Sequence, residues 1–187
     1  IGTPRALTHE EILDIIKRFA TAARICEKAG FEGVQLHGAH GYLISQFLSP
    51  LTNKRTDQWG GSVENRTRFL LEVYKAVREA TSENFIISVK LNSADFQRGG
   101  ISEEDVISVF KAVDEAGIDL IEISGGTYEA PAMAGAKADK RKASTIAREA
   151  YFLDFAEKIR QHVKCKLMVT GGFRTVEGMN AALASGA

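Results

Sequence analysis

The chain has 187 residues, and its 24 basic and 24 acidic side chains give a formal net charge of zero. This balance argues against nucleic acid or an anionic membrane as the main partner, since both select basic surfaces. No apolar run approaches the roughly 20 residues that span a bilayer, and the first residues show no signal-peptide core. We therefore expect a cytoplasmic protein without a nucleic-acid or membrane partner.

Helical and extended patterns alternate along the chain. Thr8 followed by Glu11 is a capping-box signature, and it predicts a helix that ends at Gly30. A long loop rich in Pro, Asn, Asp and Gly follows over 49–61, and a second helix is predicted to begin near Ser62. The predicted strands are 32–37, 85–92, 119–124 and 166–170, and the further predicted helices are 102–117, 144–162 and one that begins near 175.

Strands that alternate with helices predict right-handed βαβ units and a parallel sheet. One set of alternating strand positions is apolar, which suits packing under helices. The opposite set becomes polar toward the C-terminal ends of the strands: Gln35, His37, Ser88, Lys90, Asn92, Glu122, Ser124, Met168 and Thr170. This pattern favours a (β/α) barrel with its active site at that end, because an open doubly wound sheet would need two apolar faces.

A barrel of this kind closes with eight strands over roughly 250 residues. Only four βα units are visible in this sequence. The chain starts just before a helix and stops at Gly186 and Ala187, where a helix would lead to another strand. We therefore predict an α/β fold of the partial (β/α)8 TIM-barrel type, with residues 1–187 as a single-domain fragment.

The segment 37–43, His-Gly-Ala-His-Gly-Tyr-Leu, follows the first predicted strand. The imidazoles of His37 and His40 can both hydrogen-bond one carbonyl or phenolate oxygen and polarise it, as an oxyanion hole does. The phenol of Tyr42 can supply a proton to a carbon that gains electron density. Two alternatives stay open: the histidines are hydrogen-bonded structural residues, or they bind zinc, although the spacing is not that of HExxH and no carboxylate lies beside them.

Two further segments point to a cofactor. Lys90 faces inward from a predicted strand, and a buried lysine needs an anion or an acceptor. An electron-rich cofactor ring is one such acceptor, and Glu122 on the neighbouring strand is the structural alternative. Gly171 and Gly172 stand between a strand and a helix N-terminus, where backbone amides can hold a phosphate, although such a glycine pair is a weak signal by itself.

The segment 31–69, FEGVQLHGAHGYLISQFLSPLTNKRTDQWGGSVENRTRF, resembles the signature region of the old yellow enzyme family. Members of that family are FMN-dependent NADH:flavin oxidoreductases on a (β/α)8 barrel. The resemblance extends over the whole chain. It implies that the chain is the C-terminal-half portion of an FMN-binding TIM barrel, from the helix before strand 4 through the helix after strand 7.

The resemblance also implies a role for each candidate site residue. His37 and His40 would anchor the substrate oxygen over the flavin, and Tyr42 would be the proton donor. Lys90 occupies the strand-5 position where many members have arginine, so it would contact the pyrimidine end of the flavin without a bidentate contact. Gly171 and Gly172 match the phosphate loop after strand 7. No metal site is implied, and the loop 48–61 is predicted to be structural because its Arg and Asp residues can cross-link it.

The implied function is an ene-reductase-like oxidoreductase that passes hydride from NADH or NADPH, through non-covalent FMN, to an activated alkene such as an α,β-unsaturated carbonyl. A small molecule is then the substrate, a homo-oligomer stays open, and residues 1–187 alone are expected to be inactive. One rival is the dienoyl-CoA reductase and amine dehydrogenase branch, with an iron–sulfur cluster outside this chain. The other rival is a cofactor-free structural or interaction fragment.

Overall fold

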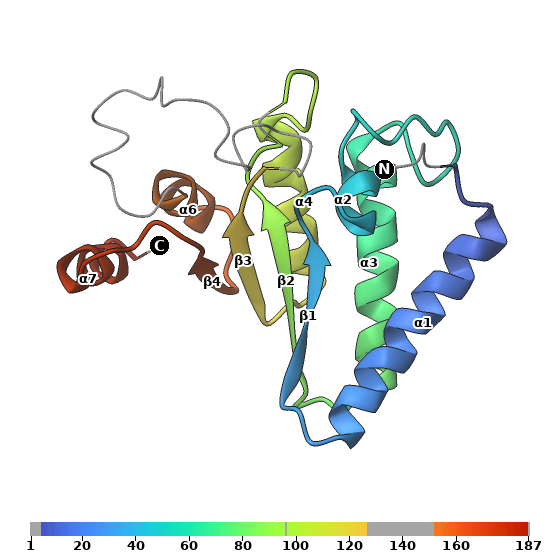
Figure 1. Cartoon of the computed structure of the whole chain (residues 1–187), viewed down its shortest axis with the longest axis horizontal. Coiled ribbons are helices and arrows are strands. Elements are labelled where there is room, and N and C mark those ends of the chain that lie inside the picture. Colours follow the sequence, from blue (N-terminus) through green and yellow to red (C-terminus); the bar gives the residue numbers. More distant parts are fainter. Residues whose placement is uncertain (1–4, 96, 127–151, 187) are drawn as a thin grey trace.

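The computed structural model describes residues 5–95, 97–126 and 152–186. Within this part, four parallel strands pair in the order β1-β2-β3-β4 (Figure 1). The strands are β1 (Gly33–Gly38), β2 (Ile86–Asn92), β3 (Leu120–Ser124) and β4 (Lys166–Val169). The helices are α1 (His9–Lys28), α2 (Leu43–Leu48), α3 (Val63–Ala80), α4 (Glu103–Glu115), α6 (Leu153–Arg160) and α7 (Val176–Ala184). The predicted α/β alternation and parallel sheet are confirmed.

Side-chain caps determine where the long helices begin. The Thr8 hydroxyl accepts the backbone N–H of Glu11, and the Glu11 carboxylate accepts the backbone N–H of Thr8, so the predicted capping box is present. Ser62, Ser102 and Thr175 cap α3, α4 and α7 in the same way, each accepting a backbone N–H three residues further on. The helix starts predicted from these residues are confirmed.

Two predicted boundaries differ from the structure. Residues 43–48, between the first strand and the long loop, form α2, for which no helix was predicted. This helix has only six residues and no side-chain cap, and it is stabilised by burial of Ile44, Phe47 and Leu48. The helix predicted over 144–162 is α6, which spans only Leu153–Arg160; residues 144–151 lie outside the described part.

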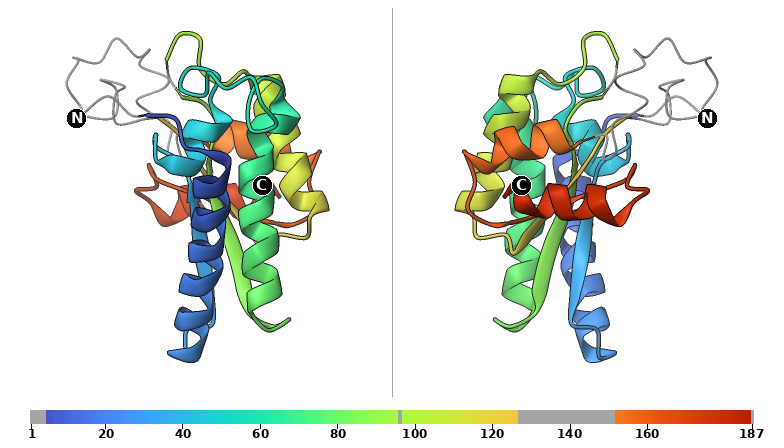
Figure 2. Two further views of the ribbon diagram at one scale, coloured as in Figure 1. Left: turned by 90° about the vertical axis from the view of Figure 1, so that its right-hand side faces the viewer. Right: turned by 90° about the vertical axis from the view of Figure 1, so that its left-hand side faces the viewer.

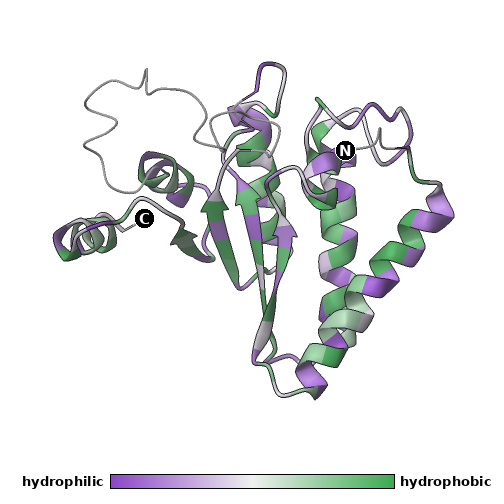
Figure 3. Cartoon of the chain, in the orientation of Figure 1, coloured by the Kyte–Doolittle hydropathy of each residue, from purple (hydrophilic) through white to green (hydrophobic). Residues whose placement is uncertain are grey.

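The core lies between the sheet and the helices α1, α3 and α4, which Figure 1 shows beside one another. Most of the predicted apolar strand positions are buried there, and their alternation with polar positions is visible as bands along the strands in Figure 3. Val34, Leu167 and Val169 are only partly buried. The buried apolar side chains of the strands are Leu36, Ile87, Val89, Leu91, Ile121 and Ile123. They meet apolar helix positions that include Phe69, Leu70, Val73, Val106 and Phe110.

The opposite ends of the strands have different roles. In both views of Figure 2, the loop 49–62 and the segment 97–101 gather at one end of the sheet, beyond the C-terminal ends of β1 and β2. The turns that lead into these strands lie at the other end. The predicted candidate residues of 37–42 therefore lie at the loop-rich end, which is where parallel α/β sheets place their sites. Among the described residues, no helix is both long and apolar enough to cross a membrane.

Candidate active site

Strand register brings four inward-facing residues into one line across the sheet. His37 is the register partner of Lys90, Lys90 of Glu122, and Glu122 of Met168. We call these four residues the inward row. Because each strand repeats with a period of two, the row faces away from the apolar core. His37, Lys90 and Glu122 were predicted to share this face of the sheet, and the register places them side by side on it.

The turn after β1 adds two rings to this row. The ring centroids of His37 and His40 lie 5.4 Å apart, with their planes at 81°. The rings of His37 and Tyr42 lie closer, with centroids 4.8 Å apart and planes at 53°. Tyr42 is 43% exposed, so its phenol is accessible from solvent. The structure thus gathers the three residues that were predicted to hold and protonate a substrate.

His40 has an unusual backbone conformation. Its φ of 63° lies in the left-handed region, which costs a non-glycine residue roughly 1–2 kcal/mol. Two residues of neighbouring strands hold it there. The backbone N–H of His40 donates to Asn92 Oδ1 at 3.2 Å, and its ring Nε2 lies 2.8 Å from Ser124 Oγ. The orientation of the imidazole is therefore fixed from β2 and β3 as well as from its own turn.

Both imidazoles have lowered pKa values. For His37, burial is the main cause of the lowered pKa, the positive charge of Lys90 adds to it, and Glu122 opposes it. The pKa of His40 is lowered by burial, by Lys90 and by His37, again against the opposing charge of Glu122. Each ring is therefore neutral near pH 7 and offers one N–H donor and one acceptor nitrogen. A neutral pair of this kind can donate to a substrate oxygen without adding charge.

Lys90 pairs with Glu122, the structural partner considered in the sequence analysis. Its ammonium lies 2.9 Å from Glu122 Oε1, and the hydroxyl of Thr170 donates to the same oxygen. Burial would raise the pKa of Glu122, but the hydrogen bonds from Thr170 and Lys90, together with the charge of Lys90, outweigh burial and lower it. An ammonium has three donors, so this ion pair leaves Lys90 able to donate to a ring placed on the inward face. The residues here fit the electron-rich edge of a flavin.

The glycine pair follows the far strand of the sheet. Thr170 still pairs with β3, since its N–H donates to the carbonyl of Ile123 at 3.2 Å. Gly171 and Gly172 then have φ values of 83° and 84°, a conformation that glycine adopts without strain. The turn leads directly to the N-terminus of α7, which fits a phosphate loop. The pair follows β4, which β2 and β3 separate from β1, and it lies at the same end of the sheet as His37.

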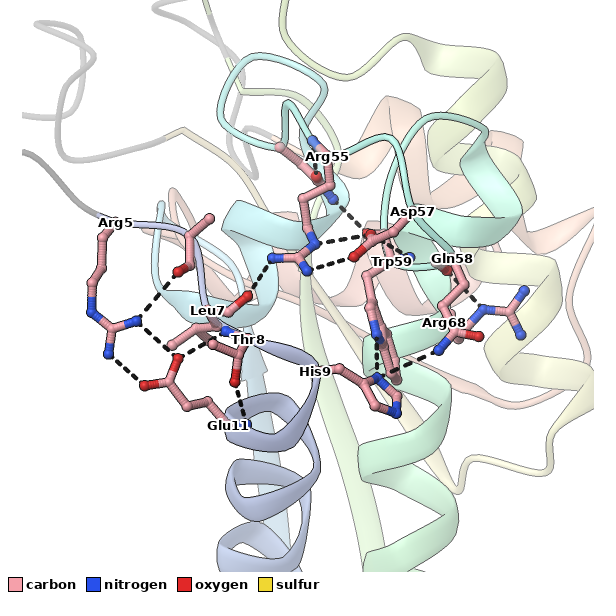
Figure 4. A network of polar contacts seen from close by, with 12 residues as sticks. Arg5, Leu7, Thr8, His9, Glu11, Arg55, Asp57, Gln58, Trp59 and Arg68 are labelled. Atoms are coloured by element: carbon pink, nitrogen blue, oxygen red, sulfur yellow. Dashed lines mark hydrogen bonds and ion pairs between the residues drawn. The ribbon is translucent and has the colours of Figure 1, made fainter.

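The long loop 49–62 is held by its own side chains, as predicted. Arg55 makes a two-point ion pair with Asp57 and donates to the carbonyl of Leu7 at 2.7 Å (Figure 4). The indole N–H of Trp59 donates to His9 Nδ1 at 3.1 Å. These contacts join the loop to the start of α1, as Figure 4 shows. Their partners lie within the loop, at the first residue of α1 and just before that helix, which supports a structural role.

Arg66 is a buried residue whose role the sequence reading missed. It donates to the carbonyls of Leu48 at 2.7 Å and Gly61 at 3.2 Å, and its guanidinium pairs with Asp105 at 2.6 Å. It thereby joins the end of α2, the long loop and the start of α4. Arg66 lies within the segment 31–69 that resembles the family signature, but its partners lie up to 39 residues away in sequence and could not be predicted locally.

Three supporting residues of the site were also missed. Asn92 and Ser124 hold His40, and Thr170 holds Glu122. Their signal was present, because all three are polar residues at inward positions near strand ends. No group of three or more histidine, cysteine or acidic side chains in the described ranges could hold a metal ion.

Comparisons with known proteins agree with this geometry. The family described as NADH:flavin oxidoreductase / NADH oxidase matches residues 2–187. The chain is 41% identical over 187 residues to the NADH-dependent flavin oxidoreductase iccE of Talaromyces variabilis, covering 99% of this chain and 45% of that protein. It is 40% identical over 190 residues to the NADH-dependent flavin oxidoreductase iliE of Neonectria sp. (strain DH2), covering 99% of this chain and 25% of that protein.

Solved structures of related oxidoreductases also resemble this chain. A complex of 2-naphthoyl-CoA reductase with 2-naphthoyl-CoA matches with a TM-score of 0.87 and 34% identity, over 97% of this chain and 27% of that one. The old yellow enzyme homologue from Zymomonas mobilis matches with a TM-score of 0.76 and 30% identity, over 99% and 48%. The chain thus spans less than half the length of these relatives and is a partial TIM-barrel-like unit. It belongs to the old yellow enzyme, or NADH:flavin oxidoreductase / NADH oxidase, family.

Proposed function

We propose that the full-length protein is an FMN-dependent oxidoreductase that passes hydride from NADH or NADPH to an activated alkene. One observation carries this proposal: His37, His40 and Tyr42 cluster at the C-terminal end of β1, beside Lys90 of β2. This cluster combines oxygen-binding donors, an accessible phenol and a cation on the inward face. Family membership supports the use of a flavin with a nicotinamide.

Each side chain has a role that its geometry permits. The two neutral imidazoles hold the carbonyl oxygen of the alkene and stabilise the negative charge that develops there. Tyr42 delivers a proton to the α-carbon, because its phenol is exposed next to His37. Lys90 faces the ring edge of the cofactor, and the amides at Gly171 and Gly172 hold its phosphate. The bound FMN would supply the hydride chemistry, and the protein supplies orientation and electrostatics.

Flavin absorbance and turnover of the purified full-length protein test the proposal. We expect a visible flavin spectrum, release of free FMN on denaturation, and oxidation of NADH or NADPH that depends on cyclohexenone under anaerobic conditions. A colourless protein that takes up no FMN would contradict the proposal and favour the cofactor-free rival. Comparison of NADH with NADPH would determine the preferred reductant.

A second candidate is reduction of an unsaturated CoA thioester in the branch that adds an iron–sulfur cluster. One observation favours it: the match to 2-naphthoyl-CoA reductase has a TM-score of 0.87, against 0.76 for the old yellow enzyme homologue. The cluster would be bound outside the present chain. Iron and acid-labile sulfide in the full-length protein, together with turnover of an enoyl-CoA in preference to cyclohexenone, would identify this branch.

A further inference from the structure

Glu122 is a buried carboxylate at the centre of the inward row. Its side chain is 8% exposed, and two neighbouring segments direct polar groups at it. Lys90 of β2 lies 2.9 Å from Oε1, and the hydroxyl of Thr170, just after β4, donates to the same atom. Two donors on one carboxylate oxygen hold the side chain in one position.

Exposure separates the two members of the ion pair. The side chain of Lys90 is 20% exposed, whereas that of Glu122 is 8% exposed. Lys90 is therefore the more accessible member of the pair to a planar ring that lies on the inward face. Because both charges are partly desolvated, each strongly influences groups nearby. A flavin ring at this face would lie near the positive charge of Lys90, which the negative charge of Glu122 largely offsets.

We propose that Glu122 is a positioning residue that fixes the ammonium of Lys90 and sets the net charge presented to the flavin edge, and so sets the reduction potential of the flavin. This inference rests on the proposed function. Two-electron reduction adds negative charge to the ring system. Nearby positive charge favours the reduced form and nearby negative charge favours the oxidised form. Glu122 acts on this equilibrium through Lys90 and without touching the ring.

The reduction potential of the flavin-loaded, full-length protein is the first measurement. Glu122→Gln should shift the midpoint potential in the positive direction, because the charge of Lys90 loses its offset. Lys90→Met should shift it in the negative direction, and the double variant should lie between the two. Glu122→Asp keeps the charge and should stay closer to the wild type than Glu122→Gln.

A matched control removes a different carboxylate. Asp114 accepts the backbone N–H groups of Lys164 and Cys165, on the connection that leads into β4. Asp114→Asn therefore removes a structural acidic group that has no contact with Lys90. The midpoint potential of this variant should equal that of the wild type. If Asp114→Asn shifted the midpoint potential as much as Glu122→Gln, the shift would not be specific to Glu122, and this outcome would contradict the proposal.

The histidines supply a readout that needs no flavin. Lys90 lowers the pKa of His37 and His40, His37 also lowers that of His40, and Glu122 raises both. NMR titration of the cofactor-stripped full-length protein should therefore show both pKa values falling in Glu122→Gln and rising in Lys90→Met. If Glu122 had only a structural role, the histidine pKa values would not shift in opposite directions in Glu122→Gln and Lys90→Met.

The outcomes separate this inference from the proposed function. A wild-type protein that binds no flavin overturns the proposed function, and this inference with it. A wild-type protein that binds flavin, with an unchanged potential in Glu122→Gln, overturns the role of Glu122 alone. If Glu122→Gln does not fold, then Lys90→Met and Glu122→Asp decide, and an unchanged potential in Lys90→Met would overturn the inference.

Discussion

His37 and Lys90 are register partners on adjacent strands, and the charge of Lys90 adds to burial in lowering the pKa of His37. A cation beside a histidine keeps the imidazole neutral at a pH where an isolated imidazole is partly charged. A neutral ring donates one hydrogen bond and carries no charge of its own. Under the proposed function, a substrate oxygen would therefore bind to neutral imidazoles, and Lys90 would be the one cationic side chain of the inward row.

Replacement of Tyr42 by phenylalanine tests proton donation. In the full-length protein, we expect Tyr42→Phe to leave flavin reduction by the nicotinamide nearly unchanged and to slow alkene reduction, because only the second half-reaction needs a proton at carbon. Stopped-flow absorbance measures the two half-reactions separately. Tyr74→Phe is the control, since the Tyr74 hydroxyl donates to the carbonyl of Gly117, away from the site. Equal slowing of both half-reactions would remove Tyr42 from this role.

Replacement of His37 and His40 by alanine tests oxygen binding. Each hydrogen bond to a polarised acceptor contributes roughly 1–3 kcal/mol. Phenols and enones should therefore bind the double variant more weakly by a few kcal/mol, measured by titration of the flavin spectrum. His162→Ala is the matched control, because His162 is exposed after α6. Stoichiometric zinc in the wild type that disappears in the double variant would replace this assignment with a metal site.

Replacement of Arg66 by methionine tests the buried link between three segments. The side chain is 6% exposed, and its loss leaves Asp105 and two carbonyls without their partner. We expect a loss of about 3 kcal/mol in the free energy of unfolding, the lower end for a broken buried pair, because Asp105 is partly exposed. Arg18→Met breaks an exposed pair with Asp14 and should cost under about 0.5 kcal/mol. Urea unfolding gives both values, and similar losses would contradict the prediction.

Acid should weaken the start of α1. Hydrogen bonds from Arg5 and from the backbone of Thr8 lower the pKa of Glu11 from 4.5 to about 2. The pKa of Glu11 is lower in the folded than in the unfolded state. Its contribution to the free energy of unfolding is therefore complete above about pH 4.5 and is lost as pH falls toward 2. The difference in unfolding free energy between wild type and Glu11→Gln should shrink across that window. It should also shrink at high salt, since the pair is exposed. Glu83→Gln is the exposed control.

Residues 1–187 purified alone should be marginally stable or oligomeric. In the described part of the chain, β1 and β4 each pair on one side only, and Phe31, Ile86, Val176 and Leu183 are exposed apolar residues. We expect weak FMN binding, because Gly171 and Gly172 offer one part of a phosphate site and Lys90 one edge of a ring. Calorimetric titration and light scattering measure both properties. A monomer that binds FMN tightly would show this unit to be self-sufficient.

The features that could be predicted from the sequence depend on residues close together in the chain. The cap at Thr8 reaches only three residues ahead, and the inward row follows from a period of two, so both were visible in the sequence. The helix α2 was missed because it depends on burial rather than on a cap. The contacts of His40 with Asn92 and Ser124 cross 52 and 84 residues of chain, and only the folded sheet brings them together.

The hydrogen bonds within the loop 49–62 also limit the insertions that the protein tolerates there. Surface connections usually accept insertions, because few of their atoms have fixed partners. Here Asn53 donates to the carbonyls of both Phe47 and Trp59, and Arg55 reaches the carbonyl of Leu7. An added residue between 53 and 59 would displace several of these contacts together. The length of this loop is therefore constrained by its own hydrogen bonds.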